Sequence, residues 1–332
     1  MIRGKLWDWL AGRSAEAPPL AVVGAFGKIP QMGDFLRIRA GGEPWLGFEA
    51  WLEQALAWGE SRRVNPWRDE PGSTPSFAFI YRAPRPVKGV AAVAGLLRPS
   101  RDAVGRTHPL VIFSTLPDVL LSGGSHLLPL AMAGFLEGAA RLARDAETMS
   151  SAAELEARLN QVPPPHLDAA LVGGYDDWAR TTPLHHAWHD MYGPKAPAIA
   201  PQTIHAMLEI LKRFGGQTAS TLRFGIRLPL GAVSPAESFW VHVCEQMAGP
   251  QVIVPTCFWE VEPTRQAILL QIGEATPSAL GEAFVPDPKN ERVCDFTRAV
   301  DPAGFAPMPA EIGAALMDQS TTVSQLLQLL AS

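Results

Sequence analysis

Cysteine is scarce in this sequence, whose 332 residues include only Cys244, Cys257 and Cys294. These cysteines are far apart and odd in number, so they do not form the framework of a disulfide-stapled secreted domain. Their spacing does not match a zinc site either. This cysteine usage is typical of a protein in a reducing compartment.

Long apolar segments are also missing. The longest apolar run, residues 127–136, is about half as long as the roughly 20 residues that a membrane-spanning helix needs. The N-terminus contains Leu6, Trp7, Trp9 and Leu10, but not the continuous apolar core of about 7–15 residues that a secretory signal has. We therefore expect a cytoplasmic protein without stable membrane insertion.

An excess of basic residues is absent as well. Lys and Arg number 28 against 33 Asp and Glu, for a formal net charge of −5. Nucleic-acid binding needs a concentrated positive field, so we expect no nucleic-acid partner. With 47% hydrophobic and 18% charged residues, the chain can bury a full core and has the length of one large or two ordinary domains.

Two segments combine glycine, proline and charge in a way that neither a helix nor a strand requires. The first is residues 24–37, GAFGKIPQMGDFLR, and the second is residues 97–110, LRPSRDAVGRTHPL. Gly24, Gly27 and Gly33 indicate turns with positive φ or close approaches between backbones. We therefore expect the charged side chains of both segments on bent loops, where functional residues are frequent.

These segments resemble the TagF family, also called ImpM, of type VI secretion-associated proteins. The matching residues are Gly24, Gly27, Lys28, Ile29, Pro30, Gly33, Asp34, Phe35 and Arg37; then Pro44, Trp45, Trp51, Leu52 and Gln54 in a Trp-rich helix; then Gly95, Leu96, Leu97, Pro99, Ser100, Asp102, Val104, Gly105, Arg106, Pro109 and Leu110. Three elements in the family's order make the resemblance specific over about residues 20–150. Arg101 departs from the pattern, which usually has an apolar residue there, and the gap between Trp45 and Trp51 is wider than usual.

The resemblance implies a non-enzymatic regulatory protein without a cofactor. It implies post-translational repression of the assembly of the type VI secretion apparatus, through binding to the forkhead-associated-domain component of that system. Some family members are fused to a serine/threonine phosphatase domain. This chain has no metal-carboxylate phosphatase pattern after residue 200, so any phosphatase partner is expected to be a separate protein.

We expect the two glycine-containing segments to lie close together and to share a polar network. The candidates, for partner binding or for bracing the loops, are Lys28, Asp34, Arg37, Ser100, Asp102 and Arg106. Asp102 is expected to accept hydrogen bonds from backbone N–H groups or from Arg106, which would hold a turn between two strands. Exposed tryptophans between residues 45 and 58, or Arg37 and Arg106, are candidate anchors for a partner.

Two other chemistries fit less well. Gly24, Gly27 and Lys28 follow an expected strand, but a phosphate-binding P-loop needs four residues between its glycines and a Ser or Thr after the lysine. His185 and His189 have the i, i+4 spacing of zinc ligands on a helix. Either this histidine region or the loop from Asp102 to Arg106 would serve an alternative function as a metal-dependent hydrolase.

That alternative lacks its usual motifs. The sequence has no HExxH glutamate beside the histidines and no GxSxG nucleophile. Residues 185–189 are therefore interpreted as part of a polar surface turn.

Residue patterns predict alternating helices and strands. Strands are expected at residues 20–26, 76–81, 90–97, 109–116, 221–228, 252–261 and 266–272. Helices are expected over the stripe Trp45, Phe48, Leu52, Ala55 and Leu56, over residues 125–144 and 202–214, and after Ser151, Ser234 and Thr322. Ser151 with Glu154, and Thr322 with Gln325, have the spacing of a capping box.

This order of elements predicts an α/β protein with a mixed, largely antiparallel sheet and helices on both faces, an α/β/α sandwich, followed by a smaller α/β region. The expected organisation is an N-terminal tail at residues 1–19, a TagF-like α/β domain at 20–192, a linker at 193–201 and the smaller α/β region at 202–332.

Overall fold

The structure, a computed structural model, describes residues 22–62, 75–82, 89–214, 223–232, 235–248, 256–262, 266–287, 289–301 and 304–332. The predicted tail at residues 1–19 lies outside these ranges. The strands are β1 Gly24–Gly27, β2 Leu36–Ile38, β3 Ser76–Tyr81, β4 Val90–Arg98, β5 Leu110–Pro117, β6 Arg223–Pro229, β7 Thr256–Glu262, β8 Ala267–Gly273 and β9 Val293–Asp295.

The α-helices are α2 Glu43–Arg62, α3 Leu127–Asp145, α4 Ala152–Leu159, α5 Ala169–Thr181, α6 Leu184–Tyr192, α7 Ala196–Phe214, α8 Ala236–Ala248, α9 Ser278–Phe284, α10 Ala310–Met317 and α11 Val323–Leu330. Short 3₁₀ helices span Asp118–Gly123 (η1) and Gly193–Lys195 (η2). No helix in the described part of the chain is long and apolar enough to cross a membrane.

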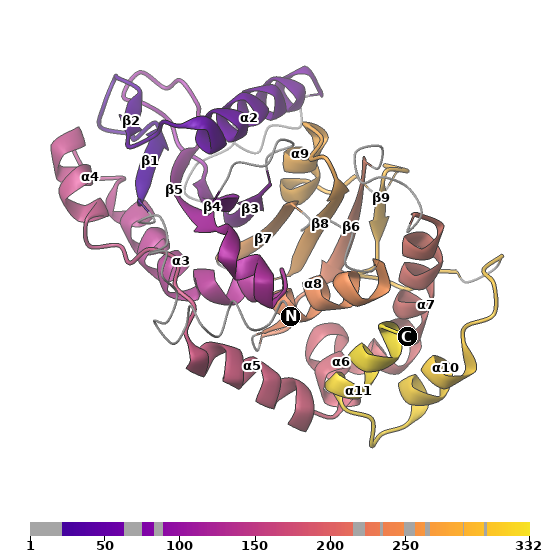
Figure 1. Ribbon diagram of the computed structural model, residues 1–332. Coiled ribbons are helices and arrows are strands. Elements are labelled where there is room, and N and C mark those ends of the chain that lie inside the picture. Colours follow the sequence, from indigo (N-terminus) through magenta and orange to yellow (C-terminus); the bar gives the residue numbers. More distant parts are fainter. Residues whose placement is uncertain are drawn as a thin grey trace.

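All of these strands belong to one sheet, with the order β2-β1-β5-β4-β3-β7-β8-β6-β9. Neighbouring strands pair antiparallel, except that β6 and β9 are parallel. The predicted mixed, largely antiparallel sheet with an α/β architecture is therefore confirmed (Figure 1).

Helices cover both faces of this sheet because its strands are apolar on both sides. On β3, Phe77 and Phe79 face an aromatic layer under α2 and α9, while Ala78 and Ile80 face the layer under α3 and α8. Burying a side chain such as Phe contributes about 1.5–3 kcal/mol. The two layers together therefore supply most of the driving force that holds the helices on the sheet.

Two of the three tryptophans of α2 belong to the core, while Trp58 is half-buried. Trp45 is 1% exposed and stacks on Phe113 at a centroid distance of 3.7 Å. Trp51 is 5% exposed and stacks on Phe258. The predicted helical stripe is confirmed, but these two tryptophans are too deeply buried to act as partner anchors.

Helix caps follow the sequence signals closely. Thr322 and Gln325 form the predicted capping box, and the Ser151 side chain accepts a hydrogen bond from the Glu154 N–H. Residues 185–189, interpreted above as a turn, lie instead within α6. Leu184 and Trp188, one helical turn apart, are buried and hold that helix in place.

The predicted linker at residues 193–201 is mostly helical instead. It begins with η2 and continues into α7, in which Ala196 and Ala200 are buried. Pro197 lies in the first turn of α7, where an N–H has no helical partner, and Pro201 is accommodated inside the helix. The strands on either side of the predicted boundary share the sheet, since β3 pairs with β7.

Candidate functional site

Two loops meet at one end of the sheet because of the strand order. β1 pairs antiparallel with β5, so the β1–β2 loop (residues 28–35) and the β4–β5 loop (residues 99–109) leave the sheet at the same end. The Ala103 N–H donates to the Met32 carbonyl at 2.9 Å. The predicted proximity of the two glycine-containing segments is therefore confirmed.

Asp102 is the centre of the contacts between these loops. Its Oδ1 accepts the N–H groups of Val104 and Arg106 at 3.1 and 2.8 Å, which closes the turn of the β4–β5 loop. Its Oδ2 accepts Arg106 Nε at 2.6 Å and forms an ion pair with Lys28 Nζ at 3.1 Å. Arg106 also donates to the Gly33 carbonyl at 2.7 Å, so one carboxylate braces both loops.

The position of Asp102 determines its charge. Burial alone would raise the pKa of Asp102, but hydrogen bonds from the Arg106 backbone and side chain and from Lys28 outweigh it and hold this pKa well below its ordinary range. The side chain is fully shielded from solvent. Asp102 is therefore an ionised carboxylate that is enclosed by its own donors.

This arrangement predicts a pH-dependent contribution to stability. Because the folded-state pKa of Asp102 lies below its unfolded value, about 3.9, its contribution is complete above about pH 4 and is lost as the pH falls toward the folded-state pKa. The free energy of unfolding, measured by urea titration at several pH values, should differ most between wild type and Asp102→Asn near neutrality. That difference should shrink below about pH 4, and a constant difference would contradict the assignment.

The glycines of the first segment differ in how much space each position leaves for a side chain. Gly27 has φ +119°, and a Cβ placed there would lie 1.9 Å from the Pro109 carbonyl oxygen. A Cβ on Gly24 would lie 2.5 Å from the Phe113 ring. Gly33 was expected to mark a positive φ or a close approach, but a Cβ there would meet no atom within 4 Å. The close contact between the loops therefore depends on Gly27 and not on Gly33.

Arg37 does not join the Asp102 network. Both of its terminal nitrogens donate to the Glu49 carboxylate on α2, and its guanidinium lies 5.0 Å from the centre of the Phe26 ring. The hydrogen bonds from Arg37 lower the pKa of Glu49. Asp34 is exposed and has no ionic partner among the described residues, so the charged side chains of the predicted network that meet are Lys28, Asp102 and Arg106.

Ser100 and His108 lie at the base of the β4–β5 loop. The Ser100 carbonyl accepts the His108 N–H at 3.1 Å, and His108 Nδ1 donates to the Pro109 carbonyl at 2.8 Å. The imidazole packs edge-on against Phe26 and Phe35. Burial lowers the pKa of His108, which favours a neutral imidazole in this aromatic cluster.

Two apolar side chains of the braced loops are exposed to solvent. Val104 is 72% exposed and Phe35 is 43% exposed, although both are large hydrophobic residues. Arg106, in the loop of Val104, donates to the carbonyl of Gly33, in the loop of Phe35. Val104 and Phe35 therefore project from adjoining loops. Exposed large hydrophobic residues on neighbouring loops are candidates for contact with a protein partner.

The histidines that support a metal site are not assembled into one. His185, His186 and His189 are exposed on α6. Among the described residues, no group of three or more His, Cys, Asp or Glu side chains is arranged to hold a metal ion.

One polar cluster was not anticipated from the sequence. Ser125 donates its N–H and its hydroxyl to Glu245, which also pairs with His126 Nδ1 at 2.7 Å. His126 stacks on His242 at 3.8 Å, and His242 Nδ1 is 3.0 Å from the Tyr175 hydroxyl. Only the packing of α3, α5 and α8 unites these residues, so no local sequence signal could have revealed them.

The polar groups of this cluster form hydrogen bonds mainly with one another. Burial would raise the pKa of Glu245, but hydrogen bonds from His126 and Ser125 lower it below its ordinary value. The Ser125 hydroxyl donates to this carboxylate, and the lowered pKa makes Glu245 a weak base toward the hydroxyl proton.

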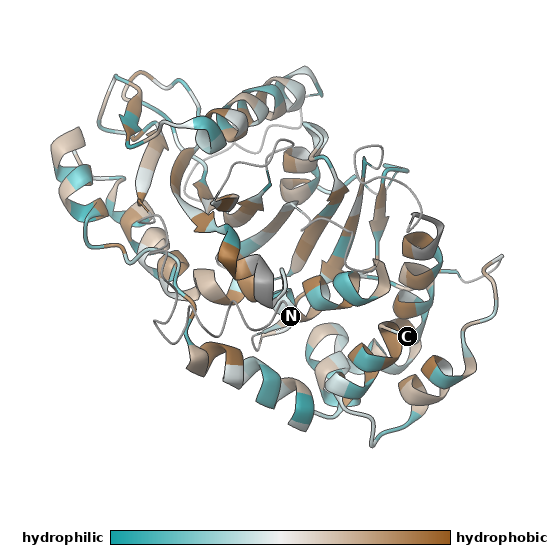
Figure 2. Cartoon of the chain, in the orientation of Figure 1, coloured by the Kyte–Doolittle hydropathy of each residue, from teal (hydrophilic) through white to brown (hydrophobic). Residues whose placement is uncertain are grey.

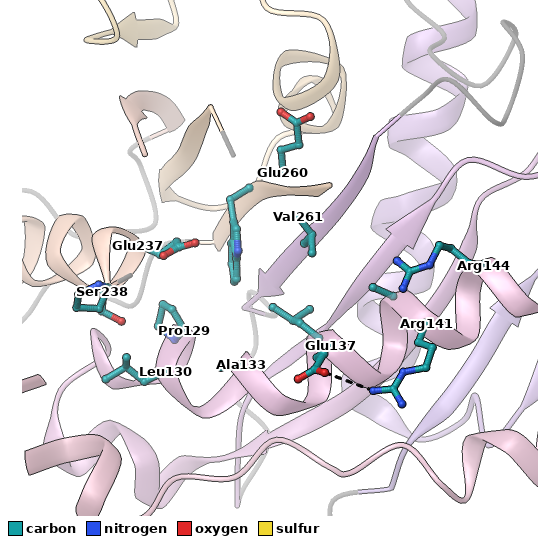
Figure 3. A pocket seen from close by; sticks show the side chains of 14 residues that line it. Pro129, Leu130, Ala133, Glu137, Arg141, Arg144, Glu237, Ser238, Glu260 and Val261 are labelled. Atoms are coloured by element: carbon teal, nitrogen blue, oxygen red, sulfur yellow. Dashed lines mark hydrogen bonds and ion pairs between the residues drawn. The ribbon is translucent and has the colours of Figure 1, made fainter. Parts of the chain in front are cut away.

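Cavities flank α3. One of about 600 Å³ lies between α3, α8 and β7, with the Glu137–Arg141 ion pair along its wall (Figure 3). Its lining is mixed, with apolar residues and charges of both signs. A second cavity, of about 390 Å³, lies between the two braced loops and the end of α3. The hydropathy colouring shows largely brown central strands and stretches of teal on covering helices such as α2 and α5 (Figure 2).

The fold and these loops define an α/β protein whose most organised polar feature is a braced loop pair that presents hydrophobic side chains. Residues 24–162 match the family model described as the TagF N-terminal domain, type VI secretion system-associated. This part of the chain is therefore similar to that family, and the predicted resemblance is confirmed over these residues. Both braced loops and α3 lie within the matched residues.

A solved crystal structure, PA0076 from Pseudomonas aeruginosa PAO1 at 2.05 Å resolution, is similar at 18% sequence identity and a TM-score of 0.41. The similarity covers 87% of this chain and 100% of that chain. No curated protein matches this sequence.

Proposed function

We propose that this chain is a non-enzymatic, cytoplasmic regulator that represses assembly of the type VI secretion apparatus by binding its forkhead-associated-domain scaffold. The match of residues 24–162 to the TagF N-terminal domain, a domain associated with type VI secretion, carries the proposal. A serine/threonine phosphatase of the same system would act as a separate protein.

The loop pair is the proposed docking surface. Asp102, the only buried carboxylate of the loop pair, already accepts hydrogen bonds from neighbouring donors. It is therefore better suited to holding the two loops together than to acting in catalysis. The surface offers Val104 and Phe35 as apolar contacts, with the largely exposed Arg106 beside them. A partner interface of ordinary size, about 800 Å² per protein, is dominated by a few such anchors.

Co-purification and deletion test this function. We expect the forkhead-associated-domain scaffold to co-purify with the tagged chain from a strain with an active type VI system, and deletion of the gene to increase secretion. Unchanged secretion together with no captured scaffold would refute the repressor role. Stoichiometric zinc in untagged protein, lost in His189→Ala, would favour the hydrolase alternative.

A further inference from the structure

We propose that the cavity between the two braced loops and the end of α3 binds an acidic peptide segment, with a carboxylate beside a small apolar residue. The cavity has a volume of about 390 Å³ and is lined by Ile29, Pro30, Arg98, Pro99, Ser100, Arg101, Leu110, Ala143, Ala146 and Glu147. The identity of the partner rests on the proposed function, whereas the chemistry of the cavity does not.

Arg98 supplies a largely buried guanidinium in the wall of the cavity. Its side chain is 14% exposed and donates to the Ser76 hydroxyl at 3.2 Å and to the Glu147 carboxylate. Glu147 is itself 49% exposed, and ion pairs with an exposed partner contribute little to stability. Arg98 therefore already holds a carboxylate that an incoming acidic side chain could replace.

Two further groups point to a carboxylate ligand. Ser100 is 6% exposed and lines the cavity, where its hydroxyl can donate to an acceptor on a ligand. Arg101 is exposed in the lining and forms no ion pair with any described residue. A hydroxyl and two guanidinium groups in one lining are all hydrogen-bond donors, and a carboxylate can accept from each of them.

The rest of the lining selects a peptide over a bare anion. Ile29, Leu110, Ala143 and Ala146 are each at most 2% exposed and form an apolar floor. Inorganic phosphate would bring only charged oxygen atoms against this floor, whereas a peptide can place an alanine or leucine side chain on it. The lining carries two arginines against one glutamate, and is therefore net positive in a chain whose formal net charge is −5.

The test uses a fluorescein-labelled peptide, Ala-Leu-Glu-Ala-Glu-Leu-Ala, and its counterpart with Gln in place of each Glu. We expect the acidic peptide to bind the full chain about tenfold or more tightly than the Gln peptide, because charge-assisted hydrogen bonds are lost. Arg101→Ser should weaken binding and Glu147→Gln should strengthen it, since the internal competitor is removed. Arg141→Ser, an exposed arginine of α3 outside this cavity, is the matched control and should change nothing.

Several results would overturn the inference. They are equal binding of the two peptides, no binding of either, or displacement of the peptide by inorganic phosphate at a concentration similar to that of unlabelled peptide. A scaffold that co-purifies equally well with wild type, Arg101→Ser and Glu147→Gln would refute this inference alone. Peptide binding with the expected response to the variants, but no captured scaffold, would instead refute the proposed function alone.

Discussion

Replacing Gly27 with alanine is expected to lower the free energy of unfolding by roughly 3–5 kcal/mol. The backbone of Gly27 has φ +119°, and the added methyl would lie 1.9 Å from the Pro109 carbonyl oxygen. That oxygen also accepts the His108 side chain, so it cannot move aside without breaking the aromatic cluster. Urea titration of the purified variant measures the loss, which would be a large part of an ordinary domain's stability.

Gly33→Ala is the matched control within the same loop. A Cβ there would meet no atom within 4 Å, and Gly33 has no positive φ. We expect a change of less than about 1 kcal/mol, in either direction. A Gly27→Ala variant as stable as Gly33→Ala would contradict the view that the two loops are locked together at Gly27.

Replacing Val104 with aspartate is expected to weaken scaffold binding by about 2 kcal/mol or more, roughly 30-fold, while leaving the fold intact. Val104 is 72% exposed, so its removal costs no core packing, yet in a complex the new carboxylate would be buried without a partner. Titration calorimetry with the purified scaffold measures the change. Phe35 is less suitable for this test because it also packs on Phe26 and His108.

Met317→Asp provides the comparison for nonspecific effects. Met317 is 76% exposed on α10, outside the residues that match the TagF domain. We expect normal binding by this variant. Equal weakening by both substitutions would indicate a nonspecific charge effect, and no weakening by either would remove the loop pair from the interface.

The candidate site could be predicted in part, because some of its determinants are local. Asp102 reaches the N–H groups of Val104 and Arg106 within its own turn, so a short-range rule for Asp in turns was sufficient. Arg37 illustrates the limit of such rules. Its partner Glu49 lies on α2, and only the packing of that helix over Phe26 decides between Glu49 and the acidic residues of the loops.

Burial was harder to anticipate than secondary structure. The stripe containing Trp45 and Phe48 predicted a helix correctly, yet whether the tryptophans of that helix were covered depended on Phe113 and Phe258 from the sheet. At the predicted linker, prolines favoured a break in the chain. The burial of Ala200 in α7 outweighed that local preference.

The sequence by itself determined the features that depend on neighbours along the chain. These are the alternating apolar strands, the caps at Ser151 and Thr322, the Asp102 turn and the three ordered motifs of the TagF resemblance. Tertiary structure alone decided which distant groups come into contact. Examples are the pairing of Glu245 with His126 and the residues that line the cavity between the loops and α3. The physical reason is that backbone and capping preferences act over a few residues, whereas strand order and helix packing join residues more than a hundred positions apart.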